Sequence, residues 1–266
     1  MNYIQSVILG VIEGITEFFP ISSTGHMIIA AYLMRILDDR ITNLFLTSVQ
    51  IGSILSIIFL YRKKIFFQKF NFYFKIFISS FPICILGFLV QKKTDIFFDN
   101  PLIVAISLFI GGLIILQSEN LYEKNILDKT THITYYKAFI IGLFQCISLI
   151  PGTSRSASTI ISCMLQNINR IASIEFSFFL SIPVIIIATC KKLFDYYYSM
   201  DFYFFFKEMK FLLLGNTISF FTSIMSVKYC MKYLKNHSFR LFGYYRIFLS
   251  IIFLMIHYLV QPIQKF

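Results

Sequence analysis

Six long apolar runs constrain the fold of this chain more than any other feature of its sequence. Hydrophobic residues make up 57% of the 266 residues and charged residues 14%, which is not the balance of an ordinary soluble domain. Each run is close to the ~20 residues that a helix needs to cross a membrane, and short charged connections separate the runs. The sequence therefore predicts an all-α polytopic membrane protein, with spans at about 43–60, 76–91, 101–117, 173–190, 211–229 and 241–260.

A polar stretch interrupts the apolar N-terminal region. Residues 10–26 read GVIEGITEFFPISSTGH, so they place two carboxylates, several hydroxyls and an imidazole among apolar side chains. We expect a helix over 3–19 that ends at Pro20 and a second helix over about 23–35, neither of which is long enough for a comfortable span. Irregular backbone is tolerated at membrane depth only where protein or a cavity covers it. The pair of helices therefore predicts a re-entrant hairpin.

A second stretch echoes the first. Residues 142–156 read GLFQCISLIPGTSRS. Matching the two prolines pairs the polar residues that follow them: Ser22 with Thr153, Ser23 with Ser154, and Thr24 with Arg155. We predict a single integral membrane domain over 1–266 that contains an internal repeat, with halves of about 1–131 and 132–266. Each half is one re-entrant helical hairpin plus three transmembrane helices.

The charges of the loops predict how the two halves lie in the membrane. Three spans in each half are an odd number, so the second half is expected to be inverted relative to the first. The loops 61–75 and 228–240 carry five and four Lys or Arg residues, which the positive-inside rule makes cytoplasmic. Both termini are then periplasmic, and the hairpins enter from opposite sides with their polar tips meeting inside the membrane, as in inverted-repeat transporters.

The net charge of +11 raises nucleic acid as an alternative partner. The Lys and Arg residues lie mainly in loops beside apolar runs, however, and do not form one basic face. Membrane orientation and contact with anionic lipid explain the charge better, so we expect membrane lipids and no nucleic acid as partners. The sequence leaves the oligomeric state open, a homodimer included.

Glu13 and Glu17 lie four residues apart, so a helix places them on one face about a turn apart. Two carboxylates in a medium of low dielectric constant repel each other unless a cation lies between them. Hard oxygen ligands suit a divalent cation, with Mg²⁺ expected first and Ca²⁺ as the alternative. The structural alternative is that the two carboxylates brace neighbouring helices.

The hydroxyl residues that follow each proline open a short helix, where free backbone N–H groups and the helix dipole favour an anion. Ordinary capping would explain Ser22, Ser23, Thr24 and Ser154 equally well. Capping does not explain Arg155. A guanidinium at the tip of a buried hairpin suits a bidentate oxyanion such as phosphate, so Arg155 indicates an anion site. A salt bridge to Glu13 or Glu17 is the alternative.

His26 follows Ser23 by three residues, close to one helical turn, so it could exchange a proton near that hydroxyl. A lone buried histidine is usually structural, and the company of Glu17 and Arg155 is what favours proton transfer here. Metal, guanidinium, hydroxyl and base together indicate phosphoryl transfer.

The sequences EGITEFFPISSTGH at 13–26 and PGTSRS at 151–156 closely resemble the two signature motifs of the bacterial undecaprenyl-diphosphate phosphatase family, also called the bacitracin resistance protein family. The resemblance covers the whole chain. It implies a multi-pass enzyme of the cytoplasmic (inner) membrane that removes the terminal phosphate of a polyprenyl diphosphate lipid, recycling the carrier for peptidoglycan synthesis. It also implies a divalent cation and an active site open to the periplasm.

Carried over residue by residue, the resemblance assigns three sets of residues. The catalytic set is Glu17, Ser23, His26 and Arg155; the substrate-binding set is Ser22, Thr24, Ser154, Arg155 and Ser156; the metal set is Glu13 and Glu17.

Two rival functions share part of this pattern. A second type of membrane lipid phosphatase needs Ser-Arg-x5-His-x3-Asp, but Ile161 and Leu165 occupy the His and Asp positions. The rival from another class is a polyprenyl-phosphate transporter or flippase that uses the same anion site. Transport needs no proton-transfer group, so His26 favours hydrolysis.

Overall fold

The computed structural model describes the chain except residues 99, 125–128, 200–201, 235–236 and 265–266, and it describes side chains for 1–90, 100, 102–124, 129–198, 208–234 and 237–258. Within these limits the regular elements are helices, apart from one isolated bridge between Thr130 and Ile168. The helices are α1 (Tyr3–Thr16), α2 (Ser23–Leu33), α3 (Arg40–Ser48), α4 (Gln50–Phe66), α5 (Phe70–Phe98), α6 (Pro101–Lys124), α7 (Tyr135–Gln145), the 3-10 helix η1 (Cys146–Leu149), α8 (Arg155–Leu165), α9 (Arg170–Ser199), α10 (Phe202–Leu234) and α11 (Arg240–Gln264).

The all-α polytopic membrane fold is confirmed. Among the described residues, six helices are long and apolar enough to cross a membrane, and they coincide with the six predicted runs. Continuous α3 and α4 form the first span, and α5, α6, α9, α10 and α11 form the others. The third span is longer than the 101–117 expected, because α6 continues to Lys124. Its last turns carry Glu119 and Glu123, whose carboxylates pair with Arg170 and Arg240.

The first hairpin is α1, a turn and α2. Asn2 caps α1 by accepting from the Gln5 N–H at 2.9 Å. The prediction that α1 reaches residue 19 was wrong: the helix ends at Thr16, because the residue before a proline disfavours the helical conformation and Pro20 cannot donate a backbone hydrogen bond. Ser22 then begins α2 as its N-cap, accepting from the Gly25 N–H at 3.2 Å.

The second hairpin, α7 to α8, is built in the same way. Its turn passes through η1 and Gly152, whose φ of +94° suits glycine. Ser154 caps α8 by accepting from the Ala157 N–H at 3.2 Å. Each of the two matched stretches thus forms a helix, a proline turn and a helix that a serine caps.

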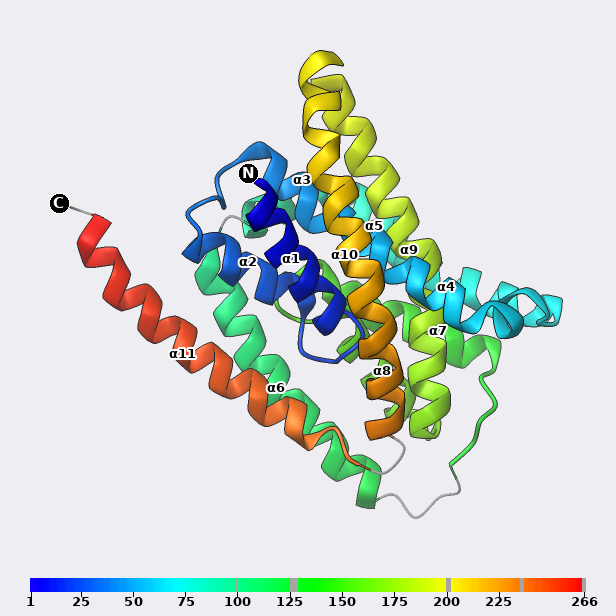
Figure 1. The fold of residues 1–266 in the computed structure, drawn as a ribbon. Helices are drawn as coiled ribbons and strands as arrows, with labels where there is room; N and C mark the ends of the chain where they lie inside the picture. The colour runs from blue at the N-terminus through cyan, green and yellow to red at the C-terminus, as the bar shows by residue number, and fades with distance from the viewer. Residues whose placement is uncertain (99, 125–128, 200–201, 235–236, 265–266) are drawn as a thin grey trace.

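The first helix of each hairpin packs against a long helix of the other half of the sequence. α1 lies along α10 (Figure 1), and α7 lies along α5. Both contacts need glycine: a Cβ on Gly10 would lie 2.7 Å from the Gly215 carbonyl oxygen, and one on Gly142 would lie 2.5 Å from the Ser79 carbonyl oxygen. α11 lies alongside α6 on another side of the hairpins (Figure 1). This pairing is what two related halves would give, and the inverted orientation and the boundaries of the halves stay predictions.

We predict that Gly52→Leu destabilises the fold. A Cβ on Gly52 in α4 would lie 2.2 Å from the Asn216 carbonyl oxygen on α10, so the helices must separate. Overpacking of this kind costs about 1–3 kcal/mol. Thermal unfolding in detergent should show a lower Tm for Gly52→Leu. Gly87→Leu is the control for stability, because a Cβ there meets only the Leu149 side chain, at 3.7 Å. An equal Tm for both variants would contradict this account of helix packing.

Candidate active site

Glu17, at the end of α1 in the first hairpin, joins this hairpin to the second. Its Oε2 accepts a hydrogen bond of 2.5 Å from the Ser23 hydroxyl, and its Oε1 accepts one of 2.7 Å from Arg155 Nη2. The Glu17 and Arg155 side chains are only 7% and 12% exposed. Arg155 Nη1 also donates to the Ser177 carbonyl at 3.2 Å. One carboxylate thus holds a hydroxyl from the first hairpin and a guanidinium from the second.

The local backbone places Ser23 and Arg155 at equivalent positions. Each is the first residue of its helix, directly after a capping serine in the left-handed region: φ is 69° at Ser22 and 74° at Ser154. This conformation is unusual for a residue with a side chain. It turns the chain sharply, so the N-termini of α2 and α8 both open at the site.

A direct contact also joins the two turns. The Ser156 hydroxyl donates to the Phe19 carbonyl at 3.0 Å, and it lies 3.0 Å from the Ser154 hydroxyl. Phe18 and Phe178 pack edge to face behind the turn, with ring centroids 5.0 Å apart. The Ser156 contact thus holds the first turn against α8, while the aromatic pair packs the first turn against α9.

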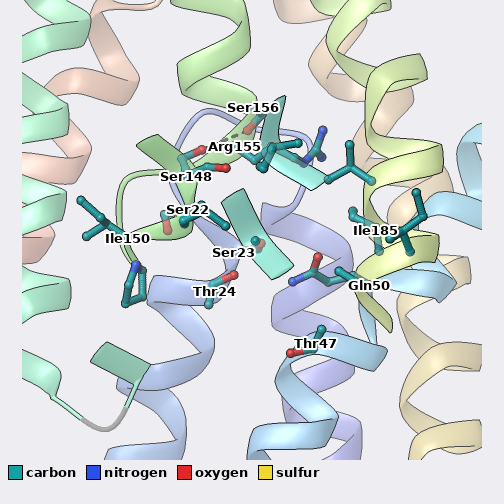
Figure 2. A pocket seen from close by; sticks show the side chains of 18 of the residues that line it. Ser22, Ser23, Thr24, Thr47, Gln50, Ser148, Ile150, Arg155, Ser156 and Ile185 are labelled. Carbon is teal, nitrogen blue, oxygen red and sulfur yellow. Dashed lines mark hydrogen bonds between the residues drawn. The ribbon is translucent and has the colours of Figure 1, made fainter. Parts of the chain in front are cut away.

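Glu17, Ser23 and Arg155 all line one cavity of about 250 Å³. Polar side chains from both hairpins and from α3 and α4 form one part of its wall (Figure 2). Apolar side chains of α5, η1 and α9 form another part, and Lys191 and Lys192 of α9 also line it. The predicted residues that line the cavity are Glu17, Ser22, Ser23, Thr24, Ser154, Arg155 and Ser156.

His26 is not among the residues that line this cavity. Its Nδ1 lies 2.7 Å from the Ser22 carbonyl oxygen, and its Nε2 lies 2.7 Å from the Tyr245 hydroxyl on α11. A carbonyl only accepts, so Nδ1 carries a hydrogen and supports the turn. The structure therefore does not bring the imidazole to the Ser23 hydroxyl, and a role for His26 in proton transfer stays a prediction.

Glu13 is fully buried and is not among the residues that line the cavity. Its Oε1 accepts from the Ser53 hydroxyl at 3.3 Å, and Ser53 is linked to Ser219 at 2.8 Å and to Ser223 at 2.9 Å. Its Oε2 has no hydrogen-bond partner among the described residues. A buried oxygen of this kind calls for a partner.

The carboxylates fit a divalent cation only in part. Glu13 Oε2 is free to act as a hard oxygen ligand, while Ser23 and Arg155 already engage both oxygens of Glu17. Within the described residues, no group of three or more His, Cys, Asp or Glu side chains could hold a metal ion. A cation bound here would therefore take most of its ligands from substrate oxygens and water, which is how Mg²⁺ is often bound.

Arg246 also contacts the site, although neither sequence motif includes it. This residue is fully buried in α11, and its guanidinium donates to the Pro20 carbonyl of the first turn and to the Gly152 and Thr153 carbonyls of the second. A signal was available, because a charged residue within an apolar span is by default a functional candidate. Thr47, Gln50 and Ser148, which also line the cavity, carried no comparable signal.

Comparison with known proteins identifies the family. The family described as bacitracin resistance protein BacA matches residues 6–252. The chain is 44% identical to the undecaprenyl-diphosphatase of Flavobacterium psychrophilum over 263 residues, 99% of each chain. It is 43% identical over 264 residues to that of Flavobacterium johnsoniae, again 99% of each chain, and 39% identical over 251 residues to that of Aquifex aeolicus, 94% of this chain and 96% of the relative. The chain therefore belongs to the bacitracin resistance protein BacA family.

Proposed function

We propose that this protein hydrolyses undecaprenyl diphosphate to undecaprenyl phosphate and inorganic phosphate. The observation that carries the proposal is Glu17, which holds the Ser23 hydroxyl and the Arg155 guanidinium at the wall of one cavity. The relatives described above are named for this reaction. By this activity the protein would recycle the lipid carrier for peptidoglycan synthesis and confer bacitracin resistance.

The diphosphate would bind between the N-termini of α2 and α8. Both helices direct free N–H groups and the positive ends of their dipoles to that point. Hydroxyls of Ser22, Thr24, Ser154 and Ser156 line the same cavity. Arg155 can exchange its pair with Glu17 for a bidentate contact with phosphoryl oxygens, because guanidinium matches both groups. This exchange would also free the Glu17 carboxylate.

Glu17 would act as the general base. Its Oε2 already accepts a hydrogen bond from the Ser23 hydroxyl, with the two oxygens 2.5 Å apart, so a proton can pass directly between them. An oxygen so activated, from Ser23 or from a water in its place, attacks the terminal phosphorus, and the bond from that phosphorus to the bridging oxygen breaks. Undecaprenyl phosphate leaves. If Ser23 attacks, water then hydrolyses the phosphoserine and restores the hydroxyl.

A divalent cation, Mg²⁺ or Ca²⁺, would be held by Glu13 and Glu17 and would neutralise charge on the phosphoryl oxygens. The unpartnered Oε2 of Glu13 supports this assignment. The chain's own contribution would be to hold the Glu13 carboxylate in place through the contact of its Oε1 with Ser53.

Hydrolysis accounts for the site better than lipid transport does. A transporter that binds a polyprenyl phosphate needs the guanidinium and the helix N-termini. It has no use for a hydroxyl held by a buried carboxylate. The contact between Ser23 and Glu17 therefore favours the enzyme.

The cavity is proposed to open to the periplasmic side of the inner membrane. Loops 61–75 and 228–240 carry the excess of Lys and Arg that marks the cytoplasmic face. The C-terminal end of α9, where Lys191 and Lys192 line the cavity, is separated from loop 228–240 by one span and from loop 61–75 by three, an odd number in both cases. The mouth near these lysines thus lies on the opposite face.

We predict that Arg155→Ala lowers kcat/KM by roughly 10²–10³-fold, the usual cost of losing one group that stabilises developing charge. Release of phosphate from undecaprenyl diphosphate by purified protein in detergent with Mg²⁺ measures this. Arg62→Ala is the control, since Arg62 is exposed and lies outside the cavity. Undiminished release by Arg155→Ala in folded protein would remove Arg155 from the site.

We predict that turnover needs a divalent cation. Excess chelator should stop phosphate release, and added Mg²⁺ should restore it. Glu13→Gln should raise the Mg²⁺ concentration needed for half-maximal activity, because one of the two proposed carboxylate ligands is lost. Full activity in excess chelator would return Glu13 to a structural role.

We predict that Gly87→Leu raises KM for undecaprenyl diphosphate by several-fold. Gly87 lines the apolar part of the cavity, so a larger side chain there occupies space that the prenyl chain would use. The same variant should leave KM for a short prenyl diphosphate close to the wild-type value. Equal changes for both substrates would place the prenyl chain elsewhere.

A further inference from the structure

Arg246 is the largest fully buried side chain among the described residues. It projects from near the N-terminal end of α11, and its partners among the described residues are all backbone carbonyls, to which it donates. The acceptors are Leu108 (3.4 Å, from Nε), Pro20 and Thr153 (3.3 and 3.0 Å, from Nη1), and Ser107 and Gly152 (3.2 and 2.8 Å, from Nη2).

The structure is shaped around this guanidinium. A Cβ on Gly111 of α6 would lie 2.0 Å from Arg246 Nη2, so only glycine leaves room there. Among the described residues, no carboxylate forms an ion pair with Arg246. A buried charge without a counter-ion is costly at membrane depth, so the guanidinium depends on the carbonyls that accept its hydrogen bonds.

The acceptors lie close to the residues that form the site. Pro20 precedes Ser23 by three residues, and Gly152 and Thr153 precede Arg155 by three and two. Between them lie Ser22 and Ser154 with their positive φ angles. Strained backbone of this kind persists only where its surroundings hold it. The five N–H groups of one planar guanidinium, spread over both turns and α6, are such a constraint.

We propose that Arg246 is a positioning residue that locks the two hairpin turns to each other and to α6. By fixing both turns with one rigid group, it places Ser23 and Arg155 at the distances at which Glu17 engages both. Only its effect on turnover rests on the proposed function; the locking of the turns can be measured without substrate.

The test compares three variants of the full-length protein in detergent. Arg246→Met removes the donors and keeps an unbranched apolar chain. Arg246→Lys keeps the charge but loses the planar fork. Arg240→Met is the matched control on the same helix, because Arg240 is partly exposed and bonds Asn120 and Glu123, away from the turns.

Hydrogen exchange of the turn peptides 17–26 and 150–158 gives the first readout. Arg246→Met should raise exchange in both peptides by about tenfold or more, since hydrogen bonds from a charged donor are lost from each turn. Arg246→Lys should raise it in the same two peptides, and Arg240→Met in neither. Wild-type exchange in Arg246→Met, or a rise confined to one turn, overturns the proposal.

Turnover gives the second readout. In Arg246→Met, kcat should fall by up to about 100-fold, and by more than KM rises, because misplaced reacting groups cost more in the transition state than in binding. An unchanged kcat with loosened turns, or full recovery of both readouts in Arg246→Lys, overturns the positioning role. If Arg246→Met does not fold, Arg246→Lys decides by the same two readouts. If wild-type protein releases no phosphate, the proposed function fails, and the exchange data still decide whether Arg246 locks the turns.

Discussion

The ion pair between Glu17 and Arg155 is the interaction on which the arrangement of the site depends. Its partners come from different hairpins, 138 residues apart in the chain, and both are largely buried. A buried carboxylate or guanidinium left without its partner is strongly destabilising, because desolvation is then not offset. The two turns are therefore stable at this depth only when they face each other. The same requirement creates a place where an anion can replace one carboxylate as the partner of a guanidinium.

The irregular backbone of the two turns also costs free energy at membrane depth. Carbonyl groups that no helix satisfies must find donors elsewhere, since lipid offers none. Side chains from other elements provide them: Ser156 of α8 donates to Phe19, and Arg246 of α11 donates to Pro20 of the first turn and to Gly152 and Thr153 of the second. Satisfying the backbone and shaping the site are thus the same set of contacts.

The sequence predicted the elements of this structure better than it predicted their contacts. The six spans and two hairpins follow from run length and from the prolines, which are local properties. Convergence of Glu17, Ser23 and Arg155 was predictable from the repeat, because the matched stretches place Ser23 and Arg155 just after equivalent turns. The direction of His26 was not, since it depends on Tyr245 of α11, a residue 219 positions away. The acceptors of Arg246 were also not predictable, because they lie far from it in the sequence. A single charge in an apolar run indicates that a partner exists, but not which carbonyls accept its hydrogen bonds.

The exchange of helices between the halves explains why neither half could form this site alone. α1 needs the groove on α10, and α7 needs the one on α5, so each hairpin is supported by a long helix of the other half. A hairpin displaced from its groove would carry its turn away from its counterpart and leave Glu17 or Arg155 unpaired. Close glycine contacts far from the cavity, such as Gly10 on Gly215 and Gly142 on Ser79, therefore act on the same distances as the polar contacts at the turns. The geometry of Glu17, Ser23 and Arg155 is in this sense a property of helix packing across the whole domain.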